Sequence, residues 1–349
     1  MTRPRVIAGL PLYRGNEHLP EALESLLLQD YSNLRIVVTD ECVSSTGRDI
    51  VERYMQLDDR IEYVANEHRL GMIGNWRSAF TESRRRYPDA EFFFWASDHD
   101  VWHPRWLSSL MAALDDDPQA VAAIPGTMGI DARGRPLLRG VERDISMRAD
   151  APPSKRMRRA VYGMSAGNMI YGLFRASAVE RVGVFPRVLL PDRLVLAKLA
   201  LHGSFRVVPR VLWYRRYFEN IQPSYARQRA SFFPDRVPLY AYAPWWVQHS
   251  VAVLDGLVRR NQGAPAVGRA RGAMLALSYS FASLTFHTRR RRHDAQRRLR
   301  RLKKRWRRRI VKPALRKAVH AKRRALHLAR RARHVAYRIR LRVHARPEI

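Results

Sequence analysis

Two carboxylates, Asp98 and Asp100, follow directly on the aromatic run Phe92–Trp95. An apolar run this short predicts a buried strand. At the carboxyl end of that strand the two side chains would lie close together, where α/β folds bind ligands. Their charges would repel unless a cation lay between them, and oxygen ligands of this kind suit Mg²⁺ or Mn²⁺. The alternative is a solvated turn in which the same residues cap a following helix that begins near Pro104.

The first hundred residues alternate strand and helix patterns. Such alternation predicts a mostly parallel α/β sheet with right-handed crossovers. Short apolar runs predict strands, and apolar residues at helical spacing predict the helices between them. The strands are expected at 6–10, 36–39, 61–64 and 92–95, and the helices at about 19–27, 45–57 and 71–86.

Polar residues and prolines stand where these strands end. Pro11, Asp40, Asn66 and Asp98 each follow a predicted strand. Because the carboxyl ends of parallel strands meet at one edge of a sheet, we expect all four to gather there.

The chain beyond Asp100 continues with less regular patterns, and we see no internal repeat. A basic segment at 152–159 indicates a mobile loop. Glycine and aspartate predict a hairpin tip at 131–134. The other expected elements are helices at 104–114 and 192–202, a short helix from Ala178, strands at 120–124, 169–175, 205–208 and 211–214, and a turn-rich stretch at 126–143.

The composition describes a globular body with a cationic appendage. The net charge is +34, and the segment from Arg289 to the end holds 27 Lys or Arg and two acidic residues, which leaves +9 for the rest. The single cysteine, Cys42, excludes an internal disulfide and fits a reducing compartment. We expect no signal peptide, because Arg3 and Arg5 lead directly into a strand, and no apolar run long enough to span a membrane.

Two apolar stretches precede the basic tail, one at about 245–257 and one at 274–286. Both suit helices that pack on the body or lie at a membrane surface. Within the tail, Leu299, Leu302, Trp306 and Ile310 are spaced as one helical stripe, which Pro313 interrupts.

The order and spacing of these segments resemble the family 2 glycosyltransferases, which have the GT-A fold and invert the anomeric centre. The resemblance covers roughly residues 5 to 216. It rests on Pro11-Leu12-Tyr13-Arg14-Gly15-Asn16, Glu21 to Leu26, Gln29, Asp40, Asn66, Leu70-Gly71, Asn75, Asp98-His99-Asp100, Gly163 to Asn168 and Pro191 to Leu196.

The resemblance implies a GT-A nucleotide-binding sheet flanked by helices, followed by C-terminal helices and the basic tail. It implies that a nucleoside-diphosphate sugar is the donor, that Asp98 and Asp100 hold Mn²⁺ or Mg²⁺, and that Asp192 is the base that deprotonates the acceptor. A helix N-terminus would favour the ionised form of Asp192, although a plain helix cap explains this residue as well. The residues implied for donor binding are Pro11, Tyr13, Asp40, Asn66, Gly71, Asn75 and Asp98.

Several positions keep more than one interpretation. Pro191 stands where the family often has an acidic residue, and Glu41-Cys42-Val43-Ser44 replaces a more usual second Asp and Gly. Arg215 and Arg216 either reach the diphosphate or lie on the surface. Tyr13 either offers its ring to the base or belongs to the core, and Asp40 either binds the donor or caps a helix. Gly167 and Asn168 either line the acceptor side or form a turn.

The basic tail has three interpretations: a solvated tail, an anchor on anionic lipid, or a non-specific binder of nucleic acid. We expect the lipid interpretation, because arginines flank amphipathic aromatic segments and lipid-linked acceptors lie at that surface. Specific nucleic-acid recognition is not expected, since no reader motif is present.

The expected enzyme therefore transfers a sugar to a glycan or glycolipid at the cytoplasmic face of the plasma membrane. Its expected parts are a nucleotide-sugar half (1–125), an acceptor half (126–220), a helical region that either packs on the body or associates with a membrane (221–288) and a polybasic tail (289–349). A GT-A nucleotidyltransferase and a non-enzymatic polyanion-binding protein are the alternatives.

Overall fold

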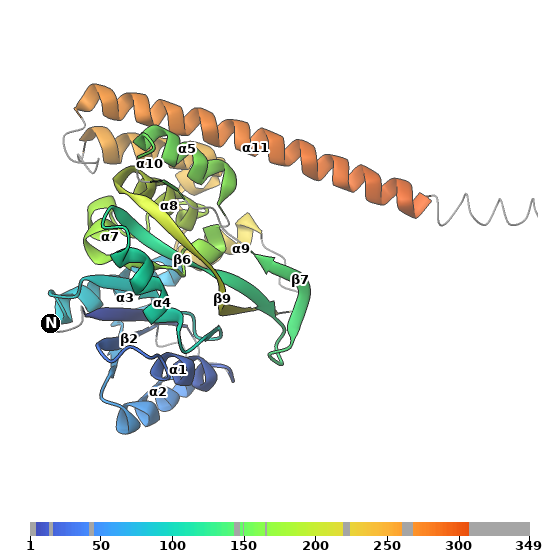
Figure 1. The fold of residues 1–349 in the computed structure, drawn as a ribbon. Helices are drawn as coiled ribbons and strands as arrows, with labels where there is room; N and C mark the ends of the chain where they lie inside the picture. The colour runs from blue at the N-terminus through green and yellow to red at the C-terminus, as the bar shows by residue number, and fades with distance from the viewer. Residues whose placement is uncertain are drawn as a thin grey trace, which may run out of the picture. The chain divides into compact units, whose positions relative to one another are not determined.

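The computed structural model describes residues 5–13, 17–41, 45–142, 147–148, 150–164, 166–218, 224–259 and 268–306. Within these residues nine strands form one sheet in the order β3-β2-β1-β4-β8-β6-β9-β5, with β7 paired to β6 (Figure 1). Helices pack on both faces of this sheet and enclose two apolar cores. The predicted α/β fold class is confirmed.

The N-terminal half of the sheet is entirely parallel. β1 pairs with β2 on one side and β4 on the other, and β2 pairs with β3. Leu12 lies opposite Asp40 and Asp40 opposite Ala65, so the strand ends meet at one edge, as predicted. The elements are β1 (Val6–Leu12), α1 (Leu19–Leu27), β2 (Leu34–Asp40), α2 (Ser45–Leu57), β3 (Ile61–Ala65), α3 (Gly71–Arg86) and β4 (Phe92–Trp95).

The aromatic strand β4 contributes side chains to the apolar cores on both faces of the sheet. Successive side chains of a strand point to opposite faces. Phe93 and Trp95 lie in the core beneath α3, while Phe92 and Phe94 lie in the core that contains the buried side of α1. All four side chains are buried, so this strand is covered on both faces.

The second half of the sheet is mixed. β8 (Leu173–Arg175) runs antiparallel to both β4 and β6 (Ala120–Ile130), and β6 runs parallel to β9 (Ser204–Arg216). β5 (Val101–Trp102) joins the far side of β9, so the chain after Asp100 returns to the sheet at once. β7 (Pro136–Glu142) pairs with β6, and the predicted turn at 131–134 connects the two.

The remaining helices all come after β4 in the chain. α8 is buried on nearly every side, and its buried Arg193 and Lys198 donate to the backbone carbonyls of Val161 and Val182. The helices are α4 (Trp106–Asp115), α5 (Pro153–Gly163), α6 (Ala166–Met169), α7 (Ala176–Val182), α8 (Pro191–His202), α9 (Tyr225–Phe232), a 3₁₀ turn (Leu239–Tyr242), α10 (Trp245–Leu254), a π-helical turn (Asp255–Arg259) and α11 (Arg269–Trp306).

The two closing strands predicted at 205–208 and 211–214 are one strand, β9. Its register against β6 shifts between Pro125 and Gly126, which lie opposite Val208 and Val211. Pro209 and Arg210 fall in the resulting bulge, where a residue without an N–H costs no ladder hydrogen bond. The proline therefore bends the strand and does not end it.

The prediction of a mobile basic loop at 152–159 is wrong, because most of this segment belongs to α5. Met157, Ala160 and Val161 form the buried side of this helix. Arg156 donates to the carbonyls of Ala200 and Leu201 at the C-terminal end of α8. Its charge thus stabilises a packed helix end and does not solvate a loop.

Two further expectations need correction. The strand predicted at 169–175 is the end of α6 followed by the short β8. The turn-rich stretch at 126–143 is mainly strand, because β6 continues to Ile130 and β7 returns alongside it.

The chain divides into two compact units, residues 1–286 and 287–349. In the first unit, α10 and the start of α11 bury side chains such as Trp245, Val253 and Tyr279 in a core of the body. Of the basic tail, the residues beyond Trp306, including Ile310, lie outside the described part of the chain. None of the described helices is both long and apolar enough to cross a bilayer.

Candidate active site

Asp98 and Asp100 follow β4 at the edge of the sheet where the parallel strands end. Asp100 is 1% exposed, and its Oδ1 accepts the backbone N–H of Arg216 at 2.7 Å. The backbone N–H of Asp100 donates to Ser97 Oγ at 3.1 Å. Burial raises the pKa of Asp100, although the charge of His99 and the hydrogen bonds that its carboxylate accepts from the Ser97 side chain and the Arg216 N–H oppose the rise. Asp98 is half-buried, so one carboxylate of the pair is fixed in the protein and the other is more open.

His99 lies between the two carboxylates. Its Nδ1 is 2.7 Å from Asp98 Oδ1 and its Nε2 is 4.0 Å from Asp100 Oδ1. Burial acts to lower the pKa of His99, but the hydrogen bond with Asp98 and the charges of both carboxylates outweigh it and raise the pKa. The two carboxylates thus favour the charged form of His99.

Asp40 is the last residue of β2 and is 1% exposed. Its Oδ2 accepts a 2.7 Å hydrogen bond from the hydroxyl of Tyr63 on β3. The carbonyl of Asp40 accepts the N–H of Asn66. Asp40 thus connects the ends of two neighbouring strands.

Asn66 and Asn75 connect three loops at this edge. Asn66 Nδ2 donates to Asn75 Oδ1 at 3.1 Å, and Asn75 Nδ2 donates to the carbonyl of Leu12 at 2.8 Å. Ser78 donates to Asn66 Oδ1. These contacts fix the end of β1 against the start of α3.

Gly71 begins α3 in the left-handed region, with φ of 72°. A Cβ there would lie 2.8 Å from Pro234 Cδ and 2.9 Å from the carbonyl oxygen of Ser231. Glu41 accepts the N–H groups of Leu70 and Gly71, each at 3.1 Å. Glu41 is 4% exposed, and burial raises its pKa against the effect of these two hydrogen bonds. Gly71 therefore shapes the loop, and Glu41 caps the helix.

One cavity of about 210 Å³ lies beside these loops. Arg69 Nη2 donates to the hydroxyl of Tyr13 at 3.1 Å, and its guanidinium lies 5.5 Å from the ring centroid of Tyr13. Tyr13 is 40% exposed, so it is not a core aromatic. The lining residues are Pro11, Tyr13, Glu41, Arg69, Met72, Asn75, Trp76 and Ser231.

Asp192 lies in the first turn of α8 and lines a second cavity of about 200 Å³. Leu190, just before the helix, has φ of 53° and is the one residue other than glycine with positive φ among the described residues. Burial raises the pKa of Asp192, while the N–H of Arg193 and the charges of Arg193 and Arg215 oppose the rise. Leu190 and Asp192 both line the cavity, so this strained turn presents the carboxylate to it.

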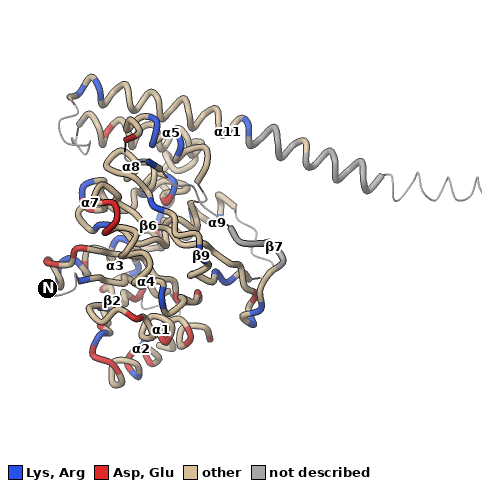
Figure 2. The backbone as a smooth tube through the Cα atoms, viewed as in Figure 1, with Lys and Arg blue, Asp and Glu red and all other residues tan. Residues whose placement is uncertain are grey.

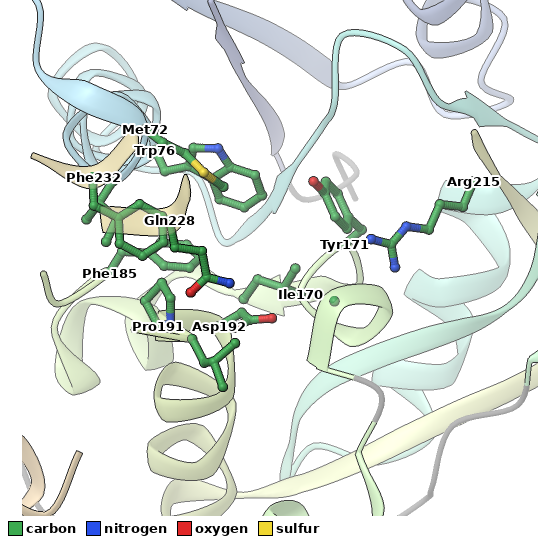
Figure 3. Close-up of a pocket in the computed structure, with 13 residues that line it drawn as sticks. Met72, Trp76, Ile170, Tyr171, Phe185, Pro191, Asp192, Arg215, Gln228 and Phe232 are labelled. Atoms are coloured by element: carbon green, nitrogen blue, oxygen red, sulfur yellow. The ribbon is translucent and has the colours of Figure 1, made fainter. Parts of the chain in front are cut away.

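The second cavity is largely apolar, and its aromatic lining residues are Trp76, Tyr171, Phe185 and Phe232, so it is called the aromatic cavity below (Figure 3). Trp76, Phe185 and Phe232 line one side, and the guanidinium of Arg215 reaches in from the other. Trp76 contacts Tyr171 and Phe185 edge-on, with centroids 5.5 and 5.1 Å apart. Met72 and Trp76 line both cavities, so these two residues lie between them.

Tyr171 links this cavity to the carboxylate pair. It stacks on Trp213 of β9 at 4.8 Å. Burial raises the pKa of its hydroxyl, and the charges of Asp100, Asp98 and Asp192 add to the rise. The negative charges of these carboxylates thus add to the effect of burial in disfavouring ionisation of the phenol.

The two arginines at the end of β9 have different roles. Arg216 is 4% exposed, and it donates to the carbonyl of His99 and to Glu21. Arg215 lines the aromatic cavity and donates to Asn168 Oδ1. Arg216 thus holds the turn that carries Asp100, and Arg215 lines the second cavity.

The residues present are consistent with a divalent ion. Asp98 and Asp100 offer hard oxygen donors at a strand end, and Mg²⁺ commonly takes one or two carboxylates and completes its shell with water and phosphate oxygens. The described residues contain no group of three or more His, Cys, Asp or Glu that forms a metal cage by itself. The protein would thus supply part of the coordination shell.

Sequence patterns missed several residues of these cavities. Glu41 and Arg69 line the first cavity, Tyr171 lines the second, and Trp76 lines both. For three of them the available signal was position, because Glu41 directly follows Asp40, and Arg69 and Trp76 flank the segment from Gly71 to Asn75. Conversely, neither cavity is lined by Asp40, Asn66, Gly71, Asp98 or Asp100.

Residues 8–181 match the sequence model of glycosyl transferase family 2. The chain is 26% identical over 85 residues to the putative teichuronic acid biosynthesis glycosyltransferase TuaG of Bacillus subtilis, covering 24% of this chain and 34% of that protein. It is 28% identical over 114 residues to the GalNAc(5)-diNAcBac-PP-undecaprenol beta-1,3-glucosyltransferase of Campylobacter jejuni, covering 32% and 35%. The matches thus span about a third of each relative.

Solved structures are similar at low identity. The S. aureus TarS fragment 1–349 in complex with UDP is 15% identical with a TM-score of 0.47, covering 83% of this chain and 92% of that one. The mannosyltransferase PcManGT from Pyrobaculum calidifontis, in complex with GDP-Man and Mn²⁺, is 17% identical with a TM-score of 0.43, covering 82% and 74%.

Proposed function

This chain belongs to glycosyl transferase family 2, and we propose that it moves a sugar from a nucleoside-diphosphate sugar to a glycan or lipid-linked acceptor with inversion at the anomeric carbon. The observation that carries the proposal is the pair of neighbouring cavities that share Met72 and Trp76. One cavity adjoins the ends of β1 and β2, and the other contains Asp192. Such an arrangement suits a donor and an acceptor that meet at one bond.

The first cavity is proposed for the donor. Tyr13 and Arg69 would lie against the base, because an exposed ring beside a guanidinium suits a flat heterocycle. Pro11 and Asn75 line the same cavity. Asp40, Asn66 and Gly71 would act by holding these loops, through the hydrogen bonds and the left-handed turn described above.

Asp98 and Asp100 are proposed to hold Mg²⁺ or Mn²⁺, with Asp98 also near the ribose. When bound, the ion supplies the counter-charge that makes a nucleoside diphosphate a better leaving group. Arg216 keeps Asp100 in place through its backbone N–H. Arg215 adds a positive charge beside the aromatic cavity, where the transferred sugar would lie.

Asp192 is proposed as the base. The acceptor hydroxyl must lose a proton as its oxygen attacks the anomeric carbon, and a carboxylate within reach can accept it. A pKa raised by burial brings Asp192 closer to the proton affinity that this step requires. Direct displacement by one acceptor with one base inverts the centre, because no enzyme nucleophile intervenes.

The acceptor and the location are proposed from two observations. The Campylobacter relative is named for a polyprenol-linked substrate, which supports a lipid-linked acceptor here. The segment from Arg289 carries +25 of the chain's net charge, which supports attachment to the anionic cytoplasmic face of the membrane. We therefore propose a peripheral enzyme of envelope polysaccharide synthesis.

A panel of nucleoside-diphosphate sugars tests the function. Purified full-length chain is incubated with each donor and Mn²⁺, and release of the nucleoside diphosphate is followed. We expect one donor to be hydrolysed well above the others and chelation to abolish the release. Release of pyrophosphate from a nucleoside triphosphate and a sugar phosphate would favour the nucleotidyltransferase. Absence of turnover with every donor, together with retained polyanion binding, would favour the non-enzymatic alternative.

A further inference from the structure

α11 presents an apolar stripe to solvent while its opposite side packs on the body. Its residues Leu275, Tyr279 and Ala282 are buried in the core. Between Arg271 and Thr288 the exposed residues are all large and apolar: Met274 (64%), Leu277 (70%), Phe281 (69%) and Leu284 (37%).

The stripe is continuous along the helix. Its spacing of three, four and three residues places the four side chains on one face. Ten residues of α-helix extend about 15 Å, so the stripe is a row of neighbouring side chains. The uncharged segment of α11 shows as tan between blue ends in Figure 2. Exposed apolar rows of this kind mark contact surfaces.

α10 contributes further exposed apolar residues next to the first half of the stripe. His249 on α10 lies 2.7 Å from the hydroxyl of Tyr279 on α11, and the carbonyl of Leu257 lies next to Gly272. The two segments are therefore antiparallel. The two residues of α10 that are exposed, Val251 (64%) and Leu254 (48%), fall opposite the first half of the stripe.

Positive charge borders the stripe at both ends. Arg269 and Arg271 precede it and are exposed, and Arg289 follows it. From Arg269 to Trp306 the sequence holds 13 Lys or Arg and one acidic residue, Asp294. An apolar row bordered by arginines is complementary to a surface that is apolar inside and anionic outside.

Other occupants lack this complementarity. A second copy of the chain would bring arginine-bordered ends together in either helix orientation, and like charges repel. The chain's own segment from 307 to 349 is also strongly basic, so it would meet the same repulsion.

We propose that the α10–α11 face, defined by Val251, Leu254, Met274, Leu277, Phe281 and Leu284, inserts into the interfacial layer of an anionic bilayer. Insertion buries the apolar row at the boundary of the acyl chains, while the bordering arginines bind the headgroups. The six apolar residues lie on the body, whereas Arg289, one of the bordering arginines, is the first residue of the basic tail. This inference rests on the proposed function only for the purpose of membrane binding, which is to hold the enzyme at a lipid-linked acceptor.

Vesicle sedimentation of the full-length chain tests the proposal. The substitutions are Leu277→Gln and Phe281→Gln, made singly and together, and the vesicles are phosphatidylcholine with and without phosphatidylglycerol. We expect each change to weaken binding to anionic vesicles by about tenfold, as for the loss of one inserted side chain, with the double change weaker still. The matched control is Leu57→Gln, because Leu57 is 78% exposed at the end of α2. Its binding should equal that of the parent.

A second measurement reports insertion directly and does not depend on affinity. Cys42 is replaced by serine, and single cysteines are introduced by Phe281→Cys or Leu57→Cys and labelled with a polarity-sensitive dye. We expect a blue shift on adding anionic vesicles for the label at 281 and none for the label at 57. Thermal melts of each variant confirm that it is folded.

Three results would overturn the proposal. Parent-like vesicle binding by the double variant would mean that charge alone holds the chain. Equal dye shifts at 281 and 57 would exclude insertion of this face. A parent dimer in sedimentation velocity that the substitutions dissociate would assign the face to a second copy. Donor hydrolysis without vesicles is measured alongside, so its absence, with insertion intact, would count against the proposed function and not against this surface.

Discussion

The carboxylate of Asp100 and the backbone N–H of Arg216 are joined by a 2.7 Å hydrogen bond across 116 residues of sequence. The bond connects the turn after β4 to the end of β9. Arg216 strengthens the connection by donating to the carbonyl of His99. The proposed metal-binding residues and Arg215 are thereby held in fixed positions relative to one another.

Asp100→Asn should abolish most donor turnover and leave the fold intact. Asparagine keeps an oxygen that accepts the N–H of Arg216 but removes the charge that would hold the cation. We expect hydrolysis of the nucleotide sugar to fall by about 10² or more. The control is Asp117→Asn, because Asp117 also accepts a backbone N–H, from Gln119. Full activity of Asp100→Asn, or undiminished turnover in excess chelator, would contradict the assignment.

Asp192→Asn should separate donor binding from transfer. The amide retains the size of the side chain but cannot accept a proton. Transfer to the acceptor should fall by roughly 10² or more, while the donor still binds with its parent affinity. Titration of nucleotide binding and a transfer assay measure the two. If binding falls as much as transfer, Asp192 belongs to the donor side.

The pH profile of transfer should show the raised pKa of Asp192. Burial raises this pKa above the ordinary value for aspartate, and a base acts only when deprotonated. The rate should therefore fall on acidification at a pH clearly above the ordinary range near about 4, and recover as the pH rises. The residual transfer rate of the Asp192→Asn variant should not show this decrease on acidification. A parent profile that stays flat down to about pH 4 would exclude Asp192 as the titrating base.

Gly71→Ala should destabilise the protein through both strain and a clash. The residue has φ of 72°, and a Cβ would meet Pro234 and the carbonyl of Ser231. Gly134→Ala is the matched control, because Gly134 has φ of 75° and no atom within 4 Å of its Cβ position. We expect about 1 kcal/mol of destabilisation for the control and about 2–3 kcal/mol for Gly71→Ala, from denaturant unfolding. Equal losses of stability in the two variants would mean that the loop around Gly71 shifts to accommodate the added Cβ.

Trp306→Ser tests the tail without changing its charge. If the tail binds lipid through an apolar stripe as well as arginines, the full-length variant should sediment less with anionic vesicles than the parent. Binding of both should weaken with added salt. Parent-like binding by the variant would leave the tail as a general polyanion binder.

The sequence determined the elements whose signals are local. Short apolar runs and helical spacing were enough for the four parallel strands and the helices between them, because each element buries its own apolar face. The edge that gathers Asp40, Asn66 and Asp98 followed from parallel topology alone. The aromatic run of β4 revealed a strand buried on both faces, because its four residues have no polar side to expose.

The tertiary structure alone decided how that edge is assembled. Tyr63 reaches Asp40, Glu41 caps α3, and Leu190 takes a left-handed conformation ahead of Asp192. Each of these depends on partners far away in sequence or on packing that outweighs local preference. For the same reason the charge of Arg156 suggested a loop, while the carbonyls of α8 made α5 a packed helix. Local patterns predict which element a segment can form. Contacts with residues far away in the sequence then determine which of its polar groups are buried, paired or exposed to a cavity.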